Sequence, residues 1–135
     1  NGILNKKSGM LGLSQLSNDM RVIENAIVKD NNQTARTALD VYCYRIKKYI
    51  GAFFAAMNGL DVLVFTGGAG ENMPIMRAQV CENMDALGIC LDQEKNARFT
   101  GNIEVLNSAE SKVSVLKVPT DEELMIAMET MRLLS

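Results

Sequence analysis

The chain has 135 residues, with 14 Lys and Arg against 16 Asp and Glu, and a formal net charge of -2 at pH 7. This length favours one domain with a modest core, and the balanced charge gives no reason to expect nucleic acid as a partner. Because the chain contains no His, nucleophile systems of the Ser-His and Cys-His types are excluded within it. The three cysteines form no CxxC pair, so we expect neither disulfides nor a zinc site, and a reducing, cytoplasmic setting.

The chain shows no pattern of a membrane or secreted protein. Its longest strongly apolar stretch, Ile50–Met57, is much shorter than the ~20 residues that cross a bilayer. The first residues, NGILNKKSG, contain no initiator Met and no signal-peptide pattern. They are typical of the middle of a polypeptide, so the sequence predicts a piece of a longer protein without a membrane partner.

Two helices are predicted in the first half of the chain. Asp19 is placed to cap a helix over Met20–Ile27, after short helical pieces that glycines interrupt. Apolar residues recur at spacings of three and four over Gln33–Met57, which predicts a long amphipathic helix. Asn58-Gly59 then supplies a stop where a residue with positive φ is needed.

A strand, a Gly-rich segment and a helix are predicted next. The run VLVF at Val62–Phe65 predicts a strand that is buried on both faces of a parallel sheet. Thr66–Gly70 follows as a loop, and we expect Asn72 to cap a helix over Met73–Leu87. A strand that ends in glycines and opens a helix presents backbone N–H groups to one point, as in phosphate sites. A tight turn without a ligand explains the glycines equally well.

Two named phosphate-binding motifs can be compared with this segment. A Walker A loop is excluded, because no Lys-Ser/Thr pair follows the glycines. The dinucleotide-binding fingerprint matches Gly68 and Gly70, and Asp92 lies where a ribose-binding acid belongs. However, Met73 occupies the place of the third glycine and Pro74 follows it, and this argues against a Rossmann site.

The last third of the chain predicts a short strand-like run at Ile89–Leu91, a helical turn after it, and weak strand character near Val105. A strand over Lys112–Val118 and a helix over Asp121–Leu134 complete the chain.

Three consecutive carboxylates, Asp121, Glu122 and Glu123, open this final helix, where acids ordinarily complement the helix dipole. Thr120 and Glu123 have the spacing of a capping box, in which the Glu side chain returns to the N–H of the cap residue. Glu122 has no such structural duty and is free to hold a hydrated Mg2+. At the other candidate, Asp19 and Arg21 are most simply a helix cap and a solvated charge.

Five blocks of sequence, in order and with their spacing, resemble the C-terminal part of the acetate, propionate and butyrate kinase family. They are LNKKSGMLGLS, SNDMR, YRIKKYIGAF, VFTGGAGEN and VPTDEELMIA, and they cover nearly the whole chain. The resemblance implies an α/β fold, a truncated actin-like ATPase (RNase H-like) lobe with a long helix, short parallel strands and flanking helices. Residues 1–135 would be the C-terminal part of the nucleotide-binding domain of an acetate kinase, with the upstream domain absent.

The resemblance also implies an activity and residue roles. The family transfers a phosphoryl group reversibly between ATP and acetate, forming acetyl phosphate and ADP, with Mg2+. The segment that matches the family's nucleotide pocket is Gly68, Ala69, Gly70, Glu71 and Asn72. The segment that matches its adenosine contact is Asp19, Met20 and Arg21. The residue that matches its Mg2+ ligand is Glu122.

The family's phosphate loop, acetate-binding arginines, catalytic Asp and histidine lie in sequence that this chain does not contain. We therefore expect no catalytic residue here and no activity of these residues alone. The family suggests a homodimer that acts on small molecules. Two alternatives stay open: a non-catalytic nucleotide-binding or assembly module and, behind it, a Rossmann-type oxidoreductase domain. The choice among acetate, propionate and butyrate lies outside this sequence.

Overall fold

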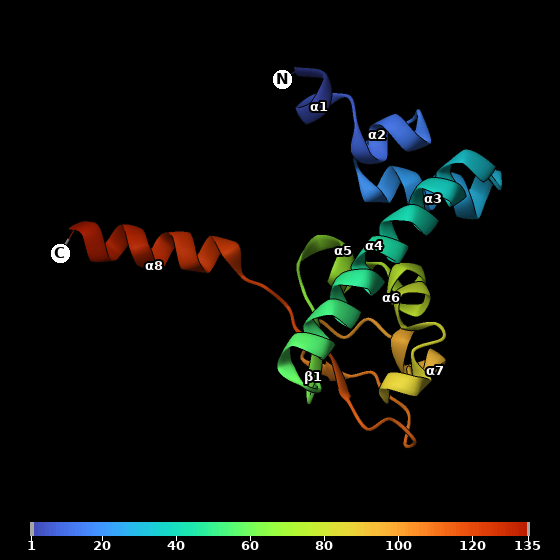
Figure 1. The fold of residues 1–135 in the computed structure, drawn as a ribbon. Helices are drawn as coiled ribbons and strands as arrows, with labels where there is room; N and C mark the ends of the chain where they lie inside the picture. Colours follow the sequence, from blue (N-terminus) through green and yellow to red (C-terminus); the bar gives the residue numbers. More distant parts are fainter. Residues whose placement is uncertain (1, 135) are drawn as a thin grey trace.

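A computed structural model describes residues 2–134 of the chain. Asn1 and Ser135, the two ends of the predicted segment 1–135, lie outside the described residues. Helices and a small sheet form the main body, and the last helix extends away from it (Figure 1). The α/β class predicted from the sequence is confirmed. Among residues 2–134, no helix is both long and apolar enough to span a membrane.

Four helices form the first half of the chain: α1 (Gly2–Lys6), α2 (Gly9–Ser14), α3 (Met20–Asp30) and α4 (Gln33–Met57). The predicted bounds of α4 are confirmed, and so is its stop, because Asn58 has a φ of 58°. Asp19 caps α3 as predicted, but α3 continues past Ile27 to Asp30. Local sequence signals therefore account for both helices.

The sheet contains three strands in the order β1-β3-β2. They are β1 (Val62–Phe65), β2 (Glu104–Val105) and β3 (Ser114–Lys117). The prediction of two parallel strands is confirmed, because β1 pairs with β3 in parallel, while β2 pairs with β3 in the opposite direction.

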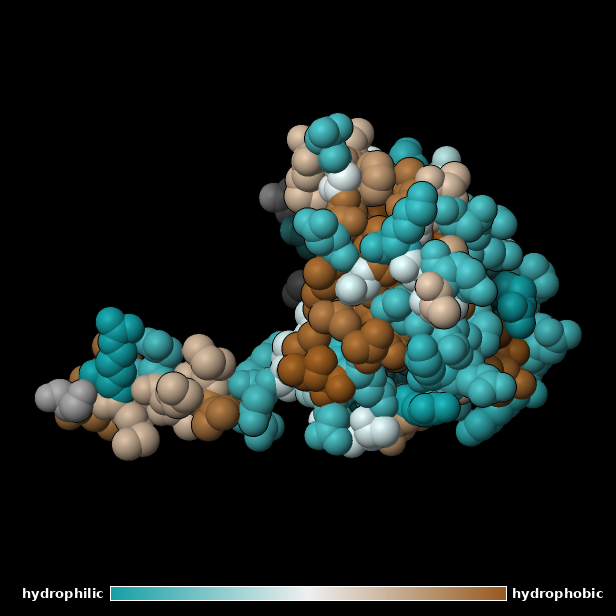
Figure 2. Space-filling model, turned by 90° about the horizontal axis from the view of Figure 1, so that it is seen from below, coloured by the Kyte–Doolittle hydropathy of each residue, from teal (hydrophilic) through white to brown (hydrophobic). Residues whose placement is uncertain are grey.

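The prediction that β1 is buried on both faces is wrong. Val62 and Val64 are 42% and 48% exposed, whereas Phe65 is buried. The alternating pattern means that one face of β1 packs on the core and the other is open. Figure 2 shows apolar side chains gathered beside the point where the last helix leaves the rest of the molecule. Phe53 and Met57 at the end of α4, which precede β1 in the sequence, are also exposed apolar residues.

The Gly-rich segment is a helix and not a loop. It forms α5 (Gly67–Asn72), and the predicted helix over 73–87 is divided into α6 (Pro74–Cys81) and a 3-10 turn at Asp85–Leu87. Asn72 ends α5 and does not cap the next helix, because Met73 holds the N-cap position of α6. Pro74 explains the break, since proline is tolerated in the first turn of a helix but not in its interior.

The end of the chain contains α7 (Gln93–Asn96) and α8 (Glu122–Leu134). In place of the predicted strand-like run, Leu91 forms an isolated bridge to Asn107. Helix α8 extends away from the other elements, and every residue of it is exposed (Figure 1).

The predicted capping box at the start of α8 is wrong. The Leu124 N–H donates to Asp121 Oδ1 at 2.9 Å, so Asp121 is the residue that caps α8. The Thr120 N–H donates to Glu71 and not to Glu123. The distant carboxylate of Glu71 therefore accepts the bond that was predicted for Glu123. The spacing of residues near Thr120 gives no indication of this long-range partner.

Candidate functional site

The candidate site lies where the two parallel strands end. Strand β1 leads directly into α5, and β3 leads through residues 118–121 into α8. The two strand ends are joined, because the Thr66 hydroxyl donates to the Val118 carbonyl at 2.8 Å. In α/β sheets, ligands bind outside the carboxyl ends of parallel strands. This edge is therefore the place to search for a binding site.

A first cavity, cavity A, lies between the start of α3 and α5 and has a volume of about 480 Å³. Most of its lining comes from the two blocks that the family resemblance assigns to nucleotide binding. Its lining residues are Asn18, Asp19, Met20, Arg21, Glu24, Gly68, Ala69, Asn72 and Met73. The volume is within the range of ~300–1,000 Å³ that small-molecule sites occupy. The fold therefore brings two distant sequence blocks to one cavity.

The α3 side of cavity A carries a charged pair. Arg21 Nη2 donates to Asp19 Oδ2 at 2.6 Å, and the Arg21 backbone N–H donates to Asp19 Oδ1 at 2.9 Å. Hydrogen bonds from the Arg21 side chain, and then from its backbone, lower the pKa of Asp19 to about 2. The guanidinium is held by its neighbour but stays exposed. It is therefore available to lie against a planar ring.

The glycines of α5 have three different environments. Gly67 has a φ of 70°, which only glycine adopts readily. A Cβ on Gly68 would meet no described atom within 4 Å, so this residue faces open space at the cavity. A Cβ on Gly70 would lie 3.2 Å from the Phe65 carbonyl carbon, so Gly70 lets α5 pack closely on β1.

Gly70 therefore lies behind the cavity wall. It lines neither cavity A nor the neighbouring cavity at the start of α8. Its carbonyl oxygen accepts a hydrogen bond from the Arg77 side chain.

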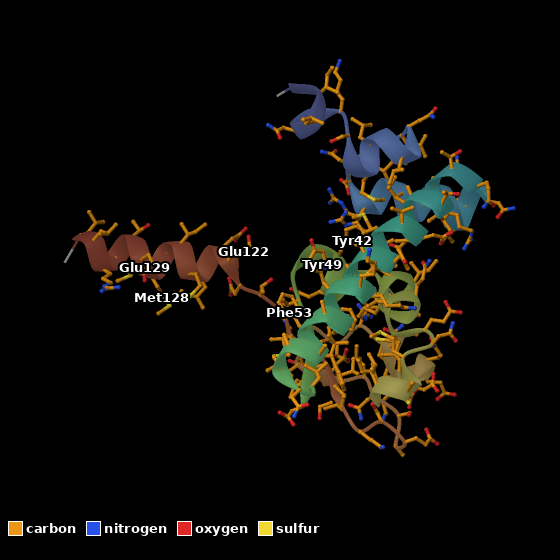
Figure 3. The ribbon with its side chains drawn as sticks, in the orientation of Figure 1. Tyr42, Tyr49, Phe53, Glu122, Met128 and Glu129 are labelled. Atoms are coloured by element: carbon orange, nitrogen blue, oxygen red, sulfur yellow. The ribbon has the colours of Figure 1, made fainter. Side chains whose placement is uncertain are left out.

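The neighbouring cavity, cavity B, has a volume of about 390 Å³ and shares Gly68 with cavity A. Acidic residues from α5 and from the start of α8 dominate it. Its lining residues are Gly68, Glu71, Thr120, Asp121, Glu122 and Glu123. Figure 3 shows Glu122 at the end of α8 that is nearest to the rest of the molecule. The two predicted functions, nucleotide and metal binding, therefore fall on adjacent cavities.

Glu71 connects the two sides of cavity B. Its Oε1 accepts hydrogen bonds from the Thr120 hydroxyl at 2.8 Å, the Thr120 N–H at 2.9 Å and the Gly67 N–H at 2.9 Å. The bonds from Thr120, side chain first, lower the pKa of Glu71 below its usual range. The Gly67 N–H is therefore not free to donate to a ligand, because Glu71 already accepts from it.

Glu122 has the character expected of a ligand-binding carboxylate. It is exposed, and no donor among the described side chains, which leave out Lys6, lies within hydrogen-bond or ion-pair distance of its carboxylate. Within the same described residues, no group of three His, Cys, Asp or Glu side chains converges on a metal position. One free carboxylate fits Mg2+ all the same, because proteins often hold this ion through one or two carboxylates, substrate phosphates and water.

Arg77 is the important residue that the sequence analysis missed. It is fully buried, and it donates to the carbonyls of Gly70 and Glu71, both at 2.8 Å. Its other nitrogens donate to Asn96 Oδ1 and to the Asn96 carbonyl, both at 2.7 Å. Burial lowers the pKa of its guanidinium. Arg77 therefore holds the last turn of α5 from behind.

A signal for Arg77 exists in the sequence. It stands on the buried face of α6, about one turn after Met73 and one turn before Val80, which are both buried. A charge on an apolar helix face indicates a buried polar network. By contrast, Asp92, the acid of the dinucleotide alternative, accepts from the N–H groups of Glu94 and Lys95 and caps α7. It lines neither cavity.

These observations define an α/β protein with a two-part cleft at the carboxyl ends of its parallel strands. A sequence model of the Acetokinase family matches residues 1–128. The chain belongs to this family.

Individual relatives agree with this assignment. The chain is 54% identical over 132 residues to an acetate kinase of Porphyromonas gingivalis, which covers 98% of the chain and 33% of that protein. The crystal structure of Porphyromonas gingivalis acetate kinase superposes with a TM-score of 0.86 and 52% identity, over 99% of this chain and 33% of that one. The crystal structure of a propionate kinase from Francisella tularensis superposes with a TM-score of 0.81 and 34% sequence identity. This match covers 95% of this chain and 32% of that one. The chain thus spans about a third of the length of these relatives.

Proposed function

We propose that these residues form the C-terminal part of the nucleotide-binding domain of an acetate kinase with the actin-like ATPase fold. The complete protein would transfer the γ-phosphoryl group of ATP reversibly to acetate, forming acetyl phosphate and ADP. The observation that carries the proposal is that the α3 block and the α5 block line one cavity, next to a free carboxylate. The family assignment supports the reaction class.

In this proposal, each wall of the cleft has its own task. Met20 and the exposed guanidinium of Arg21 would contact the adenosine on the α3 side. Gly68, with Ala69 beside it, would lie against the phosphates. Gly68 has no side chain that prevents close approach, and the first turn of a helix leaves backbone N–H groups without helical acceptors. Asn72 donates to the Gly68 carbonyl at 3.1 Å and would steady this turn.

Glu122 would hold Mg2+, which supplies positive charge beside the phosphates when it is bound. Phosphoryl transfer depends mainly on positioning and on neutralising charge, so a wall of this kind is half of such a site. No residue of this chain is assigned as the catalytic acid, base or acetate ligand. A cytoplasmic location and a homodimer remain predictions that rest on the cysteine pattern and the family resemblance.

A hydroxamate assay with the full-length protein tests this proposal. We expect acetyl phosphate formation that needs ATP, acetate and Mg2+, and no turnover by residues 1–135 alone. Gly68→Val should raise the KM for ATP much more than the KM for acetate, because its branches would fill space at the phosphates. The Mg2+ concentration that gives the half-maximal rate should rise in Glu122→Ala and should stay unchanged in Glu123→Ala. Nucleotide binding without any transfer would instead indicate a non-catalytic module.

A further inference from the structure

Glu71 belongs to the segment that the family resemblance assigns to the nucleotide, yet its carboxylate is bonded to the protein itself. One of its oxygens accepts from both the hydroxyl and the N–H of Thr120 and from the Gly67 N–H. Thr120 lies two residues before Glu122, in the connection between β3 and α8. Glu71 therefore joins the first residue of α5 to the segment that carries the proposed metal ligand.

Few other contacts hold this connection. All residues of α8 are exposed, and no other helix or strand within residues 2–134 makes extensive contact with it. Within the connection, the Val118 N–H donates to the Phe65 carbonyl at 2.9 Å, and the Thr66 hydroxyl bonds the Val118 carbonyl. Beyond Val118, the bonds from Thr120 to Glu71 are the ones that fix the path of the chain toward Glu122.

We infer that Glu71 is a positioning residue that sets the place of Glu122 relative to Gly68, and so couples the metal side of the cleft to the nucleotide side. This inference rests on the proposed function. Glu71 acts through Thr120 and does not touch the ligand. Arg77 supports the same arrangement, because it fixes the Glu71 carbonyl from the buried side of α5. Because one carboxylate bonds both Gly67 and Thr120, it fixes the start of α5 and the connection to α8 relative to each other.

The test uses the full-length protein with Glu71→Ala, Glu71→Gln, Thr120→Val and the double variant Glu71→Ala/Thr120→Val. Glu94→Ala, an exposed acid on α7 outside both cavities, is the matched control. Two quantities are measured: the Mg2+ concentration for half-maximal rate, and the backbone amide exchange of residues 118–124 without nucleotide. The exchange measurement needs neither metal nor activity, so it tests the link to Thr120 by itself.

We expect Glu71→Ala to raise the Mg2+ requirement about 10–100-fold, which is typical when a residue that orients a metal ligand is lost. Exchange at 118–124 should become faster in the same variant. Glu71→Gln keeps an acceptor oxygen and should recover most of both properties, and Thr120→Val should show a smaller rise. The double variant should be no worse than Glu71→Ala, because the two residues form one contact.

Unchanged exchange in Glu71→Ala, together with a higher KM for ATP, would overturn the inference and make Glu71 a direct nucleotide ligand. Equal losses in Glu71→Gln and Glu71→Ala would also overturn it. If Glu122→Ala leaves the Mg2+ requirement unchanged while Glu71→Ala speeds exchange, the proposed metal ligand is wrong but the contact stands. The two failures are therefore distinguishable. Should Glu71→Ala not fold, Glu71→Gln and Thr120→Val still decide the outcome.

Discussion

Helices α5 and α8 both begin at the carboxyl end of a parallel strand, but the rest of the protein holds them very differently. Helix α5 is fixed at its end by Arg77, at its start by Glu71, and along its length by the close approach of Gly70 to Phe65. Helix α8 is wholly exposed and has a local cap at Asp121. Within residues 2–134, the proposed nucleotide side of the cleft is therefore built into the core, whereas a few contacts near Thr120 hold the proposed metal side.

The largest effect is expected at the buried support of α5. Arg77→Met should lower the free energy of unfolding by roughly 3–5 kcal/mol, because it leaves the carbonyls of Gly70, Glu71 and Asn96 without their donor. Arg98→Met, at an exposed arginine, is the control and should change little. Urea unfolding followed by circular dichroism measures both. Equal stabilities would mean that α5 does not depend on Arg77.

Replacing Gly68 and replacing Gly70 in α5 should change the free energy of unfolding by different amounts. Gly70→Ala should destabilise the fold by about 1–3 kcal/mol, because its methyl group meets the Phe65 backbone. Gly68→Ala should keep the stability or raise it by up to about 1 kcal/mol, since alanine favours a helix and has room there. Thermal unfolding compares the pair. The reverse order would contradict the assignment of Gly68 to the cavity and Gly70 to packing.

The helix caps provide a smaller contrast. Asn32→Ala removes the acceptor of the Ala35 N–H at the start of α4 and should cost about 1 kcal/mol of global stability. Asp121→Ala removes the equivalent bond in α8, but it should speed amide exchange within residues 122–134 and leave the global midpoint unchanged. A lower global midpoint for Asp121→Ala would show that α8 is part of the cooperative core.

The smallest effect concerns the titration of Glu71. Its pKa is lowered in the folded protein, so its bonds to Thr120 add stability above the unfolded value of about 4.3 and lose it as the pH falls through the folded value. Thr120→Val removes the largest cause and should raise the pKa of Glu71 toward its usual range. A carbon-13 titration of the carboxyl group measures this change. An identical pKa in both proteins would mean that the hydroxyl bond is absent.

Local signals in the sequence are sufficient for the parts of the fold that stabilise themselves. The periodicity of α4, the cap at Asp19 and the stop at Asn58 act within a few residues, and all three predictions are confirmed. Helix α5 is different, because GGAGEN has poor intrinsic helix propensity. Its helix depends on the hydrogen bond that Arg77 donates to Gly70 and on the one that Glu71 accepts from Gly67. The sequence shows a charge on the buried face of α6, but it does not show that the Arg77 side chain turns back to the carbonyls of Gly70 and Glu71.

The same limit applies at the start of α8, where Thr120 bonds a carboxylate that lies 49 positions earlier in the chain. The candidate site was accessible from the sequence only in part. The glycines of the α5 block are compatible with phosphate binding, and the family resemblance assigns both the α3 block and the α5 block to the nucleotide. The fold alone shows that the two blocks line one cavity and that Gly70 lies behind it.

Titration of the isotope-labelled chain with ADP, with and without Mg2+, tests the central claim most directly. We expect the largest changes in amide chemical shift at residues 19–21 and 68–69, and further changes at 120–123 only when Mg2+ is present. Changes confined to the cavity between α6 and the segment 82–93 would contradict this assignment, because that cavity shares no residue with cavity A or cavity B.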